Sequence, residues 1–294
     1  MKLFEKYFGN QNQSAVKPSV GCDLIAASLD CPYEYIPGGA KCETLSELFD
    51  AAVAEGREQG YYPVLIATRE IDLAMTIYKH TGLWDILADV MEREDGMNTI
   101  NPDFAFGEKE LQTLREYRAK LIHAWKESDA DDFLEERISQ YIENDDEFDL
   151  EKDWGGAKEG ILFDDTRRSI SVPFSDTFKC GKELLLAKIP VSEPWQIAAW
   201  LPMGGWNECP DPKDMLAMAK HWYEKYGAVI CCVSSAALEF RVSNPPADFE
   251  QAYKLAKEQF YFCEDRVWQY APKYNLRTLA NGLTQSPYWY FWWD

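Results

Sequence analysis

The residues best suited to chemistry lie in one loop near Trp206. A thiol, Cys209, and a carboxylate, Glu208, stand just before a predicted helix that starts near Pro212. A thiol near a helix N-terminus has a lowered pKa and ionises more readily. With Glu208 or His221 as base, Cys209 could act as a nucleophile. The competing interpretation is a rigid aromatic plug with Cys209 buried. Because His221 follows Cys209 by 12 residues, direct contact between them is disfavoured.

The same loop also has the composition of a binding surface. Two adjacent glycines permit positive φ and close approach by a ligand or another chain. A tryptophan offers a flat apolar face and one hydrogen-bond donor. The predicted binding residues are Gly204, Gly205, Trp206, Asn207 and Glu208, together with Trp292, Trp293 and Asp294 at the end of the chain.

The sequence gives no indication of a metal or a cofactor. Glu208, Asp211 and Asp214 could be a carboxylate cluster, but acidic residues are also favoured at a helix N-terminus. There are only 3 histidines and no Cys-x-x-Cys pair, so we predict no metal site. No complete phosphate-loop or dinucleotide-binding motif occurs either, so we predict no cofactor.

The final residues, Tyr288–Asp294, form an aromatic block. Read as a strand, with side chains on alternating faces, the block is aromatic on both faces. This favours a central or covered strand, and the alternative is an exposed surface for a partner. Asp294 carries two carboxylates, which suggests that this end reaches water.

Charge is unevenly distributed along the chain. The net charge is −20, and residues 127–165 hold 16 acidic and 3 basic residues. A field of this sign opposes binding to nucleic acid or to an anionic membrane and favours a basic partner, although a charged segment is also a common solubilising face.

Residue patterns predict an α+β fold. Residues 1–150 read as a helix-rich region with a small sheet, in which residues 20–29 are expected to be strand. Residues 151–183 read as an acidic linker with irregular strands, and 144–158 as a linker or loop. Residues 184–294 read as an aromatic-rich α/β domain whose helices, 212–226 and 249–262, pack on a mixed sheet.

Two features bear on the compartment. No apolar run reaches the length of a membrane helix or a signal peptide. The 8 cysteines lack any motif of paired cysteines, which favours reduced, mostly buried thiols. We therefore expect a cytoplasmic protein.

Five motifs occur in combination in the last part of the chain. They are Glu193-Pro-Trp-Gln-Ile-Ala-Ala-Trp-Leu-Pro-Met-Gly-Gly-Trp-Asn-Glu-Cys-Pro-Asp-Pro212, His221-Trp-Tyr-Glu-Lys-Tyr-Gly-Ala228, Leu238-Glu-Phe240, Glu258-Gln-Phe-Tyr-Phe-Cys263 and Trp289-Tyr-Phe-Trp-Trp-Asp294. With them, residues 185–294 resemble the bacterial family 4253 of domains of unknown function. The resemblance implies a bacterial or phage-related α/β domain that forms one unit, and it brings no activity or catalytic residue.

Two functions remain open from the sequence. The first is a non-enzymatic, acidic module of the immunity or antitoxin kind, which binds a protein partner of basic character. The second is an enzyme with its site at Trp206–Cys209. A structural subunit of a larger assembly is hard to separate from the first by sequence, and the oligomeric state stays open.

Overall fold

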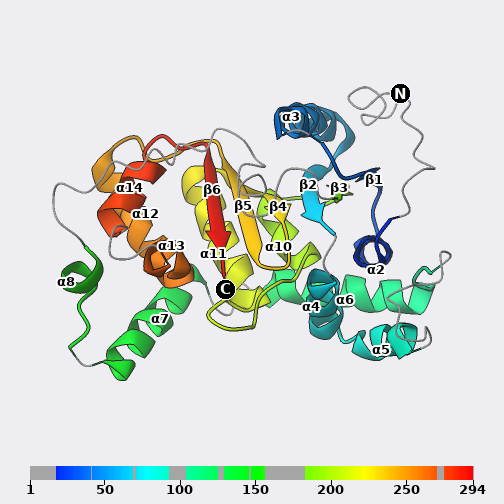
Figure 1. The fold of residues 1–294 in the computed structure, drawn as a ribbon, viewed down its shortest axis with the longest axis horizontal. Helices are drawn as coiled ribbons and strands as arrows, with labels where there is room; N and C mark the ends of the chain where they lie inside the picture. The colour runs from blue at the N-terminus through cyan, green and yellow to red at the C-terminus, as the bar shows by residue number, and fades with distance from the viewer. Residues whose placement is uncertain are drawn as a thin grey trace.

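The protein is built around one mixed sheet of six strands, in the order β1-β3-β2-β4-β5-β6 (Figure 1). The structure is a computed structural model that describes residues 18–40, 42–68, 71–92, 104–124, 129–145, 147–155, 183–269 and 275–293. The predicted helix before residue 18 and the predicted strands at 161–178 lie outside these ranges.

The chain begins with alternating helices and strands and then runs through five helices in succession, α4 to α8, before it returns to the sheet. The first part of the chain forms α2 (Val20–Leu29), β1 (Tyr33–Ile36), α3 (Cys42–Gln59), β2 (Tyr62–Ala67), α4 (Asp72–Thr81), α5 (Trp84–Glu92), α6 (Glu108–Ala124), α7 (Ala130–Asn144) and α8 (Leu150–Trp154). The second part forms β3 (Leu184–Ile189), the 3-10 turn η2 (Pro194–Gln196), α10 (Ile197–Trp200), α11 (Pro212–Tyr226), β4 (Ala228–Val233), β5 (Ala237–Val242), α12 (Phe249–Phe262), α13 (Asp265–Trp268), α14 (Leu276–Leu283) and β6 (Tyr288–Trp292).

The sheet joins the two parts of the chain. β3 lies between β1 and β2 and is antiparallel to both, so the first part contributes two strands to the sheet of the second. β2 and β4 are parallel, with Leu65 opposite Cys232. The predicted α+β class is confirmed. The predicted separate small sheet of residues 1–150 is wrong, because both of its strands pair within the common sheet; the domain boundaries themselves stay a prediction.

The two faces of the sheet are covered differently. Successive strand residues point to opposite faces, and in β2 this sends Val64 and Ile66 into one core and Leu65 and Ala67 into the other. The larger core includes buried residues of α2, α4, α6, α10, α11, α12 and α14. The smaller core lies under α3.

Residues 20–29 form a helix, and the predicted strand there is wrong. The Ser19 side chain caps this helix by accepting a hydrogen bond from the Cys22 backbone N–H at 3.2 Å. The buried positions recur at helical spacing, with Leu24, Ile25 and Ser28 among them. A short apolar run of small residues fits either structure, and here packing against α4 decides for the helix.

The acidic segment after α7 contains a short helix, α8, inside what the sequence indicated as a linker. Asp149 caps α8 by accepting from the backbone N–H groups of Glu151 and Lys152. Glu151 then accepts a hydrogen bond from the Tyr253 hydroxyl at 2.6 Å and pairs with Lys257. These contacts dock α8 on α12, so this part of the segment is ordered by tertiary contacts.

The terminal aromatic block is the edge strand β6, which pairs only with β5 among the described strands. The predicted strand is confirmed. Of the two positions predicted for it, central or covered, the central one is wrong, and the covered one agrees with the burial of one face. Successive residues of β6 point to opposite faces of the sheet. Trp289, Phe291 and Trp293 on one face are buried, whereas Tyr288 and Tyr290 on the other face are half-buried. The strict alternation of apolar and polar residues from Leu238 to Val242 predicts a half-exposed strand, but β5 is buried over most of its length.

Candidate functional site

The loop that links α10 to α11 lies at the edge of the sheet where β2 and β4 end. Since these strands are parallel, their carboxyl ends share one edge, which is where ligands of α/β sheets commonly bind. α4 follows β2 and the turn at residues 235–236 follows β4, and both stand beside loop residues 204–206 around a common groove. The fold therefore places the predicted binding loop in a favourable position.

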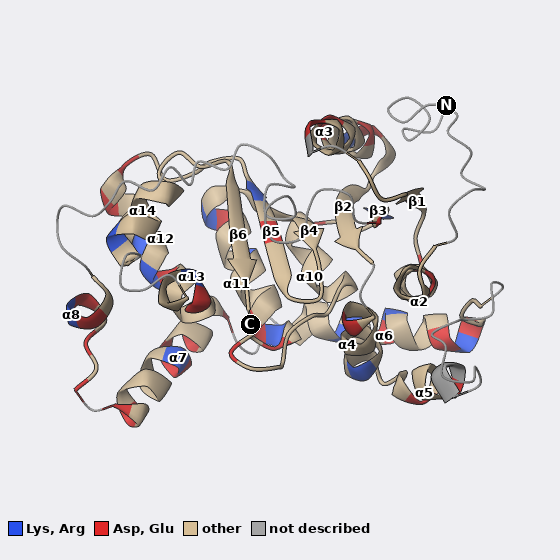
Figure 2. Cartoon of the chain, viewed as in Figure 1, with Lys and Arg blue, Asp and Glu red and all other residues tan. Residues whose placement is uncertain are grey.

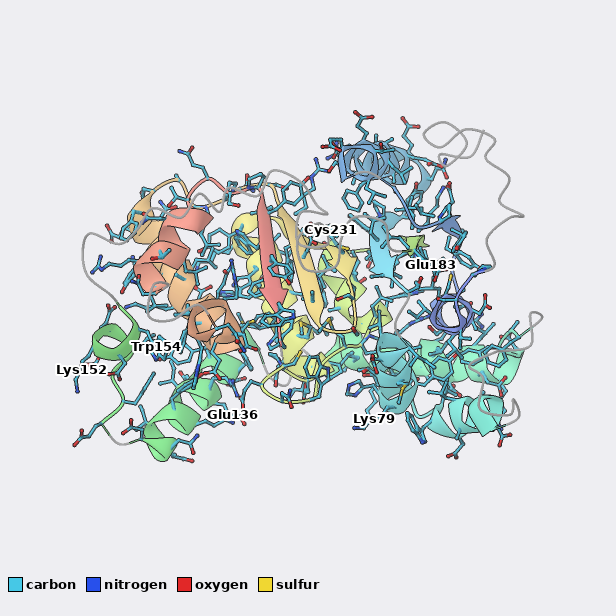
Figure 3. All side chains as sticks on the ribbon, viewed as in Figure 1. Lys79, Glu136, Lys152, Trp154, Glu183 and Cys231 are labelled. Carbon is cyan, nitrogen blue, oxygen red and sulfur yellow. The ribbon has the colours of Figure 1, made fainter. Side chains whose placement is uncertain are left out.

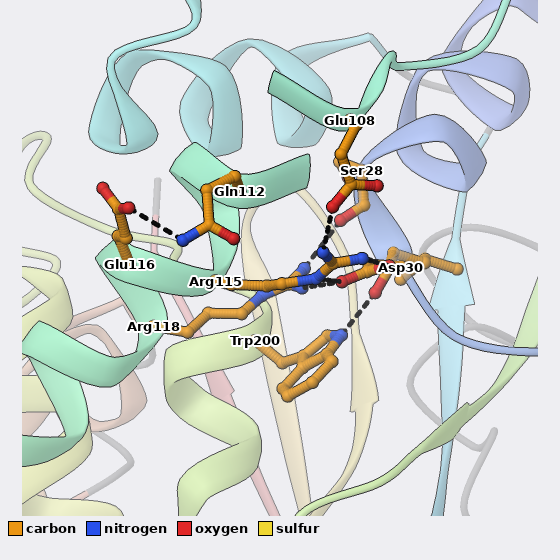
Figure 4. Close-up of polar contacts among 9 residues, drawn as sticks. Ser28, Asp30, Glu108, Gln112, Arg115, Glu116, Arg118 and Trp200 are labelled. Carbon is orange, nitrogen blue, oxygen red and sulfur yellow. Dashed lines mark hydrogen bonds and ion pairs between the residues drawn. The ribbon is translucent and has the colours of Figure 1, made fainter. Parts of the chain in front are cut away.

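A buried arginine fixes the start of this loop (Figure 4). The Arg118 guanidinium of α6 stacks on the Trp200 ring, 4.0 Å from its centroid, and donates to the Ser28 carbonyl at 2.6 Å. The Trp200 indole N–H donates to the Leu29 carbonyl at 2.6 Å. Burial lowers the pKa of Arg118 to about 10, a value at which the side chain remains charged at neutral pH. The N-terminal helices thus hold the residue from which the loop departs.

The loop itself is a tight turn closed by backbone hydrogen bonds. Gly204 and Gly205 have φ of 91° and 74°, a region that side chains with a Cβ disfavour. The Gly205 N–H lies 3.1 Å from the Cys209 carbonyl and 3.2 Å from the Pro210 carbonyl. The Cys209 N–H donates to the Trp206 carbonyl at 3.0 Å. The turn therefore has a fixed shape before any partner binds.

His80 of α4 supports the turn from one side. Its Nε2 atom lies 2.9 Å from the Gly204 carbonyl oxygen. A carbonyl only accepts, so Nε2 must carry the hydrogen, and a neutral ring then has its lone pair on Nδ1. A Cβ on Gly205 would lie 3.1 Å from His80 Cε1, so the ring packs closely on the glycine.

On the α4 side of the turn lies a groove of about 520 Å³, here called the aromatic groove. Its walls include Met75 and His80 of α4, Trp84 at the start of α5, and loop residues 204–206. Trp84 is 43% exposed, whereas Trp206 is half-buried. The volume falls within the range of about 300–1,000 Å³ that is common for ligand pockets.

On the α7 side lies a smaller cavity of about 210 Å³, here called the acidic hollow. Its charged lining residues are Glu136, Arg137, Glu208, Asp211 and Asp214. Four carboxylates thus face one guanidinium. The Arg137 Nη2 atom contacts Glu208 Oε2 at 3.0 Å, which ties the loop to α7. Gly205 lines both cavities, and Figure 3 shows Lys79 of α4 and Glu136 of α7 on opposite sides of the loop.

The charge of the acidic hollow perturbs one of its carboxylates. Burial, followed by the negative charge of Asp211, raises the pKa of Asp214 to about 6. The pKa of Glu264 is also raised, by burial and by the negative charge of Glu208. A carboxylate with a raised pKa is one whose charge is poorly compensated. The hollow therefore favours an added positive charge.

Asp214→Asn is expected to stabilise the protein at pH 8. Because the folded pKa lies above the ordinary value, ionised Asp214 lowers stability above pH 6, and this penalty fades as the pH falls from about 6 towards 4. Because solvent screens this partly exposed carboxylate, the free energy of unfolding at pH 8 is expected to rise by only about 1 kcal/mol. Urea unfolding at pH 8 and pH 4.5 measures it. Glu250→Gln, an exposed first-turn carboxylate of α12, is the control, and an equal gain in both variants would contradict the prediction.

Cys209 does not have the properties of an activated thiol. Its side chain is 4% exposed, and burial raises the pKa of the thiol well above its usual range. The expectation of a lowered pKa is therefore wrong, because desolvation outweighs the effect of the nearby helix N-terminus. The described cysteines are all free, and most are buried.

His221 takes part in a different contact. Its Nε2 atom lies 3.3 Å from Glu258 Oε2, and the same carboxylate accepts from the Trp222 indole at 3.0 Å and from Lys225 at 2.7 Å. Burial alone would raise the pKa of Glu258, but the hydrogen bonds from His221 and Lys225 lower it. Thus His221 joins α11 to α12 through its contact with Glu258.

The structure brings the predicted terminal residues to the same edge of the sheet. The Trp293 N–H donates to the Ala236 carbonyl at 3.0 Å, and Ala236 lines the aromatic groove. Trp293 itself is buried, at 1% exposure. Trp292 is half-buried, and its carbonyl accepts from the Cys263 thiol at 3.1 Å. Asp294 lies outside the described residues.

Sequence reasoning missed the walls that two distant helices supply. His80 and Trp84 border the aromatic groove, and Glu136 and Arg137 border the acidic hollow. The density of carboxylates in α7 was visible in the sequence, but its position beside the loop was not. In the part of the chain that the structure describes, no group of three or more His, Cys, Asp or Glu residues is arranged to hold a metal ion.

The comparisons with known proteins identify the C-terminal region. Residues 185–294 match the family model described as Domain of unknown function (DUF4253). The match contains the loop, Glu258 and strands β4, β5 and β6, whereas α4 and α7 lie outside it. No curated protein and no solved structure matches the chain. Within the described ranges, none of the helices has the length and hydropathy needed to cross a bilayer.

Proposed function

We propose that the protein is a non-enzymatic binding module that recognises a basic segment of a partner protein. The observation that carries the proposal is the acidic hollow beside the glycine turn. There Glu136, Glu208, Asp211 and Asp214 face a single guanidinium, and the pKa of Asp214 is raised to about 6. A lysine or arginine side chain entering the hollow would supply the missing positive charge.

The surrounding surface supports a basic partner. α7, which lines the hollow, and α8, which docks on α12, carry many of the acidic residues of the central segment (Figure 2). Their field attracts a basic protein over a distance of roughly a Debye length and repels nucleic acid. A module of this kind acts by covering a basic surface of its partner, in the manner of an immunity protein or antitoxin.

The alternative, an enzyme at Trp206–Cys209, receives less support from the geometry. Cys209 is buried and its pKa is raised. Glu208 pairs with Arg137, and His221 pairs with Glu258. Glu208 and Cys209 both line the acidic hollow, but each candidate base is engaged by another partner, whereas a cysteine nucleophile needs its base within hydrogen-bond reach of the thiol.

The double variant Glu136→Gln/Glu208→Gln is expected to weaken binding of a short peptide of repeating alanine, glycine and arginine by roughly tenfold or more. Hydrogen bonds to charged groups contribute about 1.5–3 kcal/mol each, and about 1.4 kcal/mol is tenfold in affinity. Isothermal titration with the full chain at low and physiological salt measures the change. Glutamine replacing arginine in the peptide should abolish binding to the unaltered protein.

The matched control is Glu135→Gln/Glu143→Gln, which removes the same charge from exposed positions of α7 that do not line the acidic hollow. This variant should bind within about twofold of the unaltered protein, since distant exposed charges contribute little. If both double variants lost the same amount of peptide affinity, the effect would come from the net charge of the protein and not from the hollow. That result would overturn the assignment of the hollow.

A further inference from the structure

The aromatic groove exposes a tryptophan within a mainly apolar concave surface. Trp84 is 43% exposed and faces the same groove as Met75 and Trp206. Tryptophan is enriched among the residues that dominate binding energy, and methionine adapts its shape to different partners. An exposed tryptophan in a concave, mostly apolar site therefore indicates an occupant with an apolar face.

The groove is held in shape by contacts that do not depend on an occupant. His80 reaches from α4 to the Gly204 carbonyl at 2.9 Å, and the turn beyond it is closed by the hydrogen bonds of Gly205. The loop is tied to α7 on its other side through Glu208 and Arg137. A preformed site avoids the entropy that ordering a loop would cost on binding.

The groove and the acidic hollow are neighbours separated by one glycine. Gly205 lines both cavities and is exposed, and it has no side chain to stand between them. A chain segment crossing the turn at Gly205 can place one side chain in each cavity. The chemistry of the two cavities differs. The exposed surface of the groove is mainly apolar, with one cation and one carboxylate of α4, Lys79 and Asp72, also in its lining, whereas four carboxylates and one guanidinium line the hollow.

We propose that the aromatic groove binds an aromatic or large aliphatic side chain of the same partner segment whose basic side chain enters the acidic hollow. The inference rests on the proposed function and narrows its partner to a segment with an apolar residue close to an arginine or lysine. Trp84 contributes the exposed wall of this subsite. Charge complementarity in the adjoining hollow selects a basic segment as the occupant.

The test compares two peptides and two variants by isothermal titration. One peptide repeats alanine, glycine and arginine, and the other has phenylalanine in place of alanine. The phenylalanine peptide should bind the unaltered protein roughly tenfold more tightly, and Trp84→Ala should remove that gain. Trp268→Ala is the matched control, because Trp268 is 51% exposed and does not line the groove. It should retain the gain.

The possible outcomes separate this inference from the proposed function. Equal affinity for the two peptides, or a gain that survives in Trp84→Ala, overturns the inference while arginine-dependent binding still supports the proposed function. If neither peptide binds, both fail. Because Trp84 and Trp268 are exposed to a similar extent, 43% and 51%, the two alanine variants should have similar urea midpoints, so a loss of binding confined to Trp84→Ala cannot be attributed to unfolding.

Discussion

Gly204→Ala is expected to lower the free energy of unfolding by roughly 2–5 kcal/mol. The backbone at Gly204 has φ of 91°, and a Cβ added there would lie 1.9 Å from the Pro210 carbonyl oxygen. The left-handed conformation costs a residue with a Cβ about 1–2 kcal/mol, and overpacking adds about 1–3 kcal/mol. The clashing atom belongs to the backbone and cannot rotate away. Urea unfolding followed by tryptophan fluorescence measures the loss.

Gly82→Ala separates the two contributions to this loss. Gly82 has φ of 75°, and a Cβ there would meet no atom within 4 Å. Its replacement should therefore cost only the conformational term of about 1–2 kcal/mol. Equal losses in the two alanine variants would show that the turn yields to the added methyl group, and the rigidity argued for the loop would then be wrong.

The same substitution bears on binding. The Pro210 carbonyl that the Cβ would strike is also 3.2 Å from the Gly205 N–H, so a displaced Pro210 opens the turn. Asp211 follows directly and caps α11 by accepting from Lys213 and Asp214. We expect Gly204→Ala to weaken arginine-peptide binding as well, because the carboxylates of the hollow are positioned by this turn.

Trp222→Ala is expected to cost about 3–5 kcal/mol of stability. Trp222 is fully buried, stacks on Phe291 at a centroid distance of 5.3 Å, and meets Phe262 and Trp289 edge-on. Truncating a buried aromatic residue loses its transfer energy and leaves a cavity. Glu258 would also lose the indole donor at 3.0 Å. The urea midpoint at constant pH measures the effect.

Trp222→Phe and Trp268→Ala show which part of the loss comes from packing. The phenylalanine variant retains most of the ring contacts and loses the bond to Glu258, so it should cost about 1–3 kcal/mol. Trp268 is half-exposed and its ring lies 6.1 Å from that of Trp154, so its removal should cost about 1 kcal/mol. If Trp222→Ala cost no more than Trp268→Ala, the aromatic cluster would not be the stabilising centre of the C-terminal region.

Gly204 and Trp222 lie in two sequence motifs of the C-terminal region, and these motifs have different roles. The loop motif at 201–212 forms the turn between the two cavities. The motifs containing His221, Trp222 and Glu258 meet in the core between α11 and α12. The second set is explained by stability, since its polar atoms satisfy one another around a buried indole. The first set leaves exposed glycine and carboxylate groups at a concave surface.

Local sequence patterns determined many of the elements around the loop. Asp211, Pro212 and Gly227 predicted the limits of α11, which the structure confirms with a side-chain cap, a proline in the first turn and a left-handed C-cap. The aromatic terminal block, read with a period of two, predicted a strand, and β6 is that strand. These features depend on residues a few positions apart, where backbone geometry limits the choices.

Tertiary structure alone decided the rest. Pairing of β2 with β3 places the helices of the first part beside a loop more than a hundred residues away, and no local pattern encodes such a contact. The burial of Cys209, which reverses the expected direction of its pKa shift, follows from that packing. The contacts of His80 with the Gly204 carbonyl and of Arg137 with Glu208 follow from the same packing. The sequence by itself determined the turn and its chemistry, whereas the cavities on either side exist because long-range strand pairing and helix packing bring α4 and α7 to it.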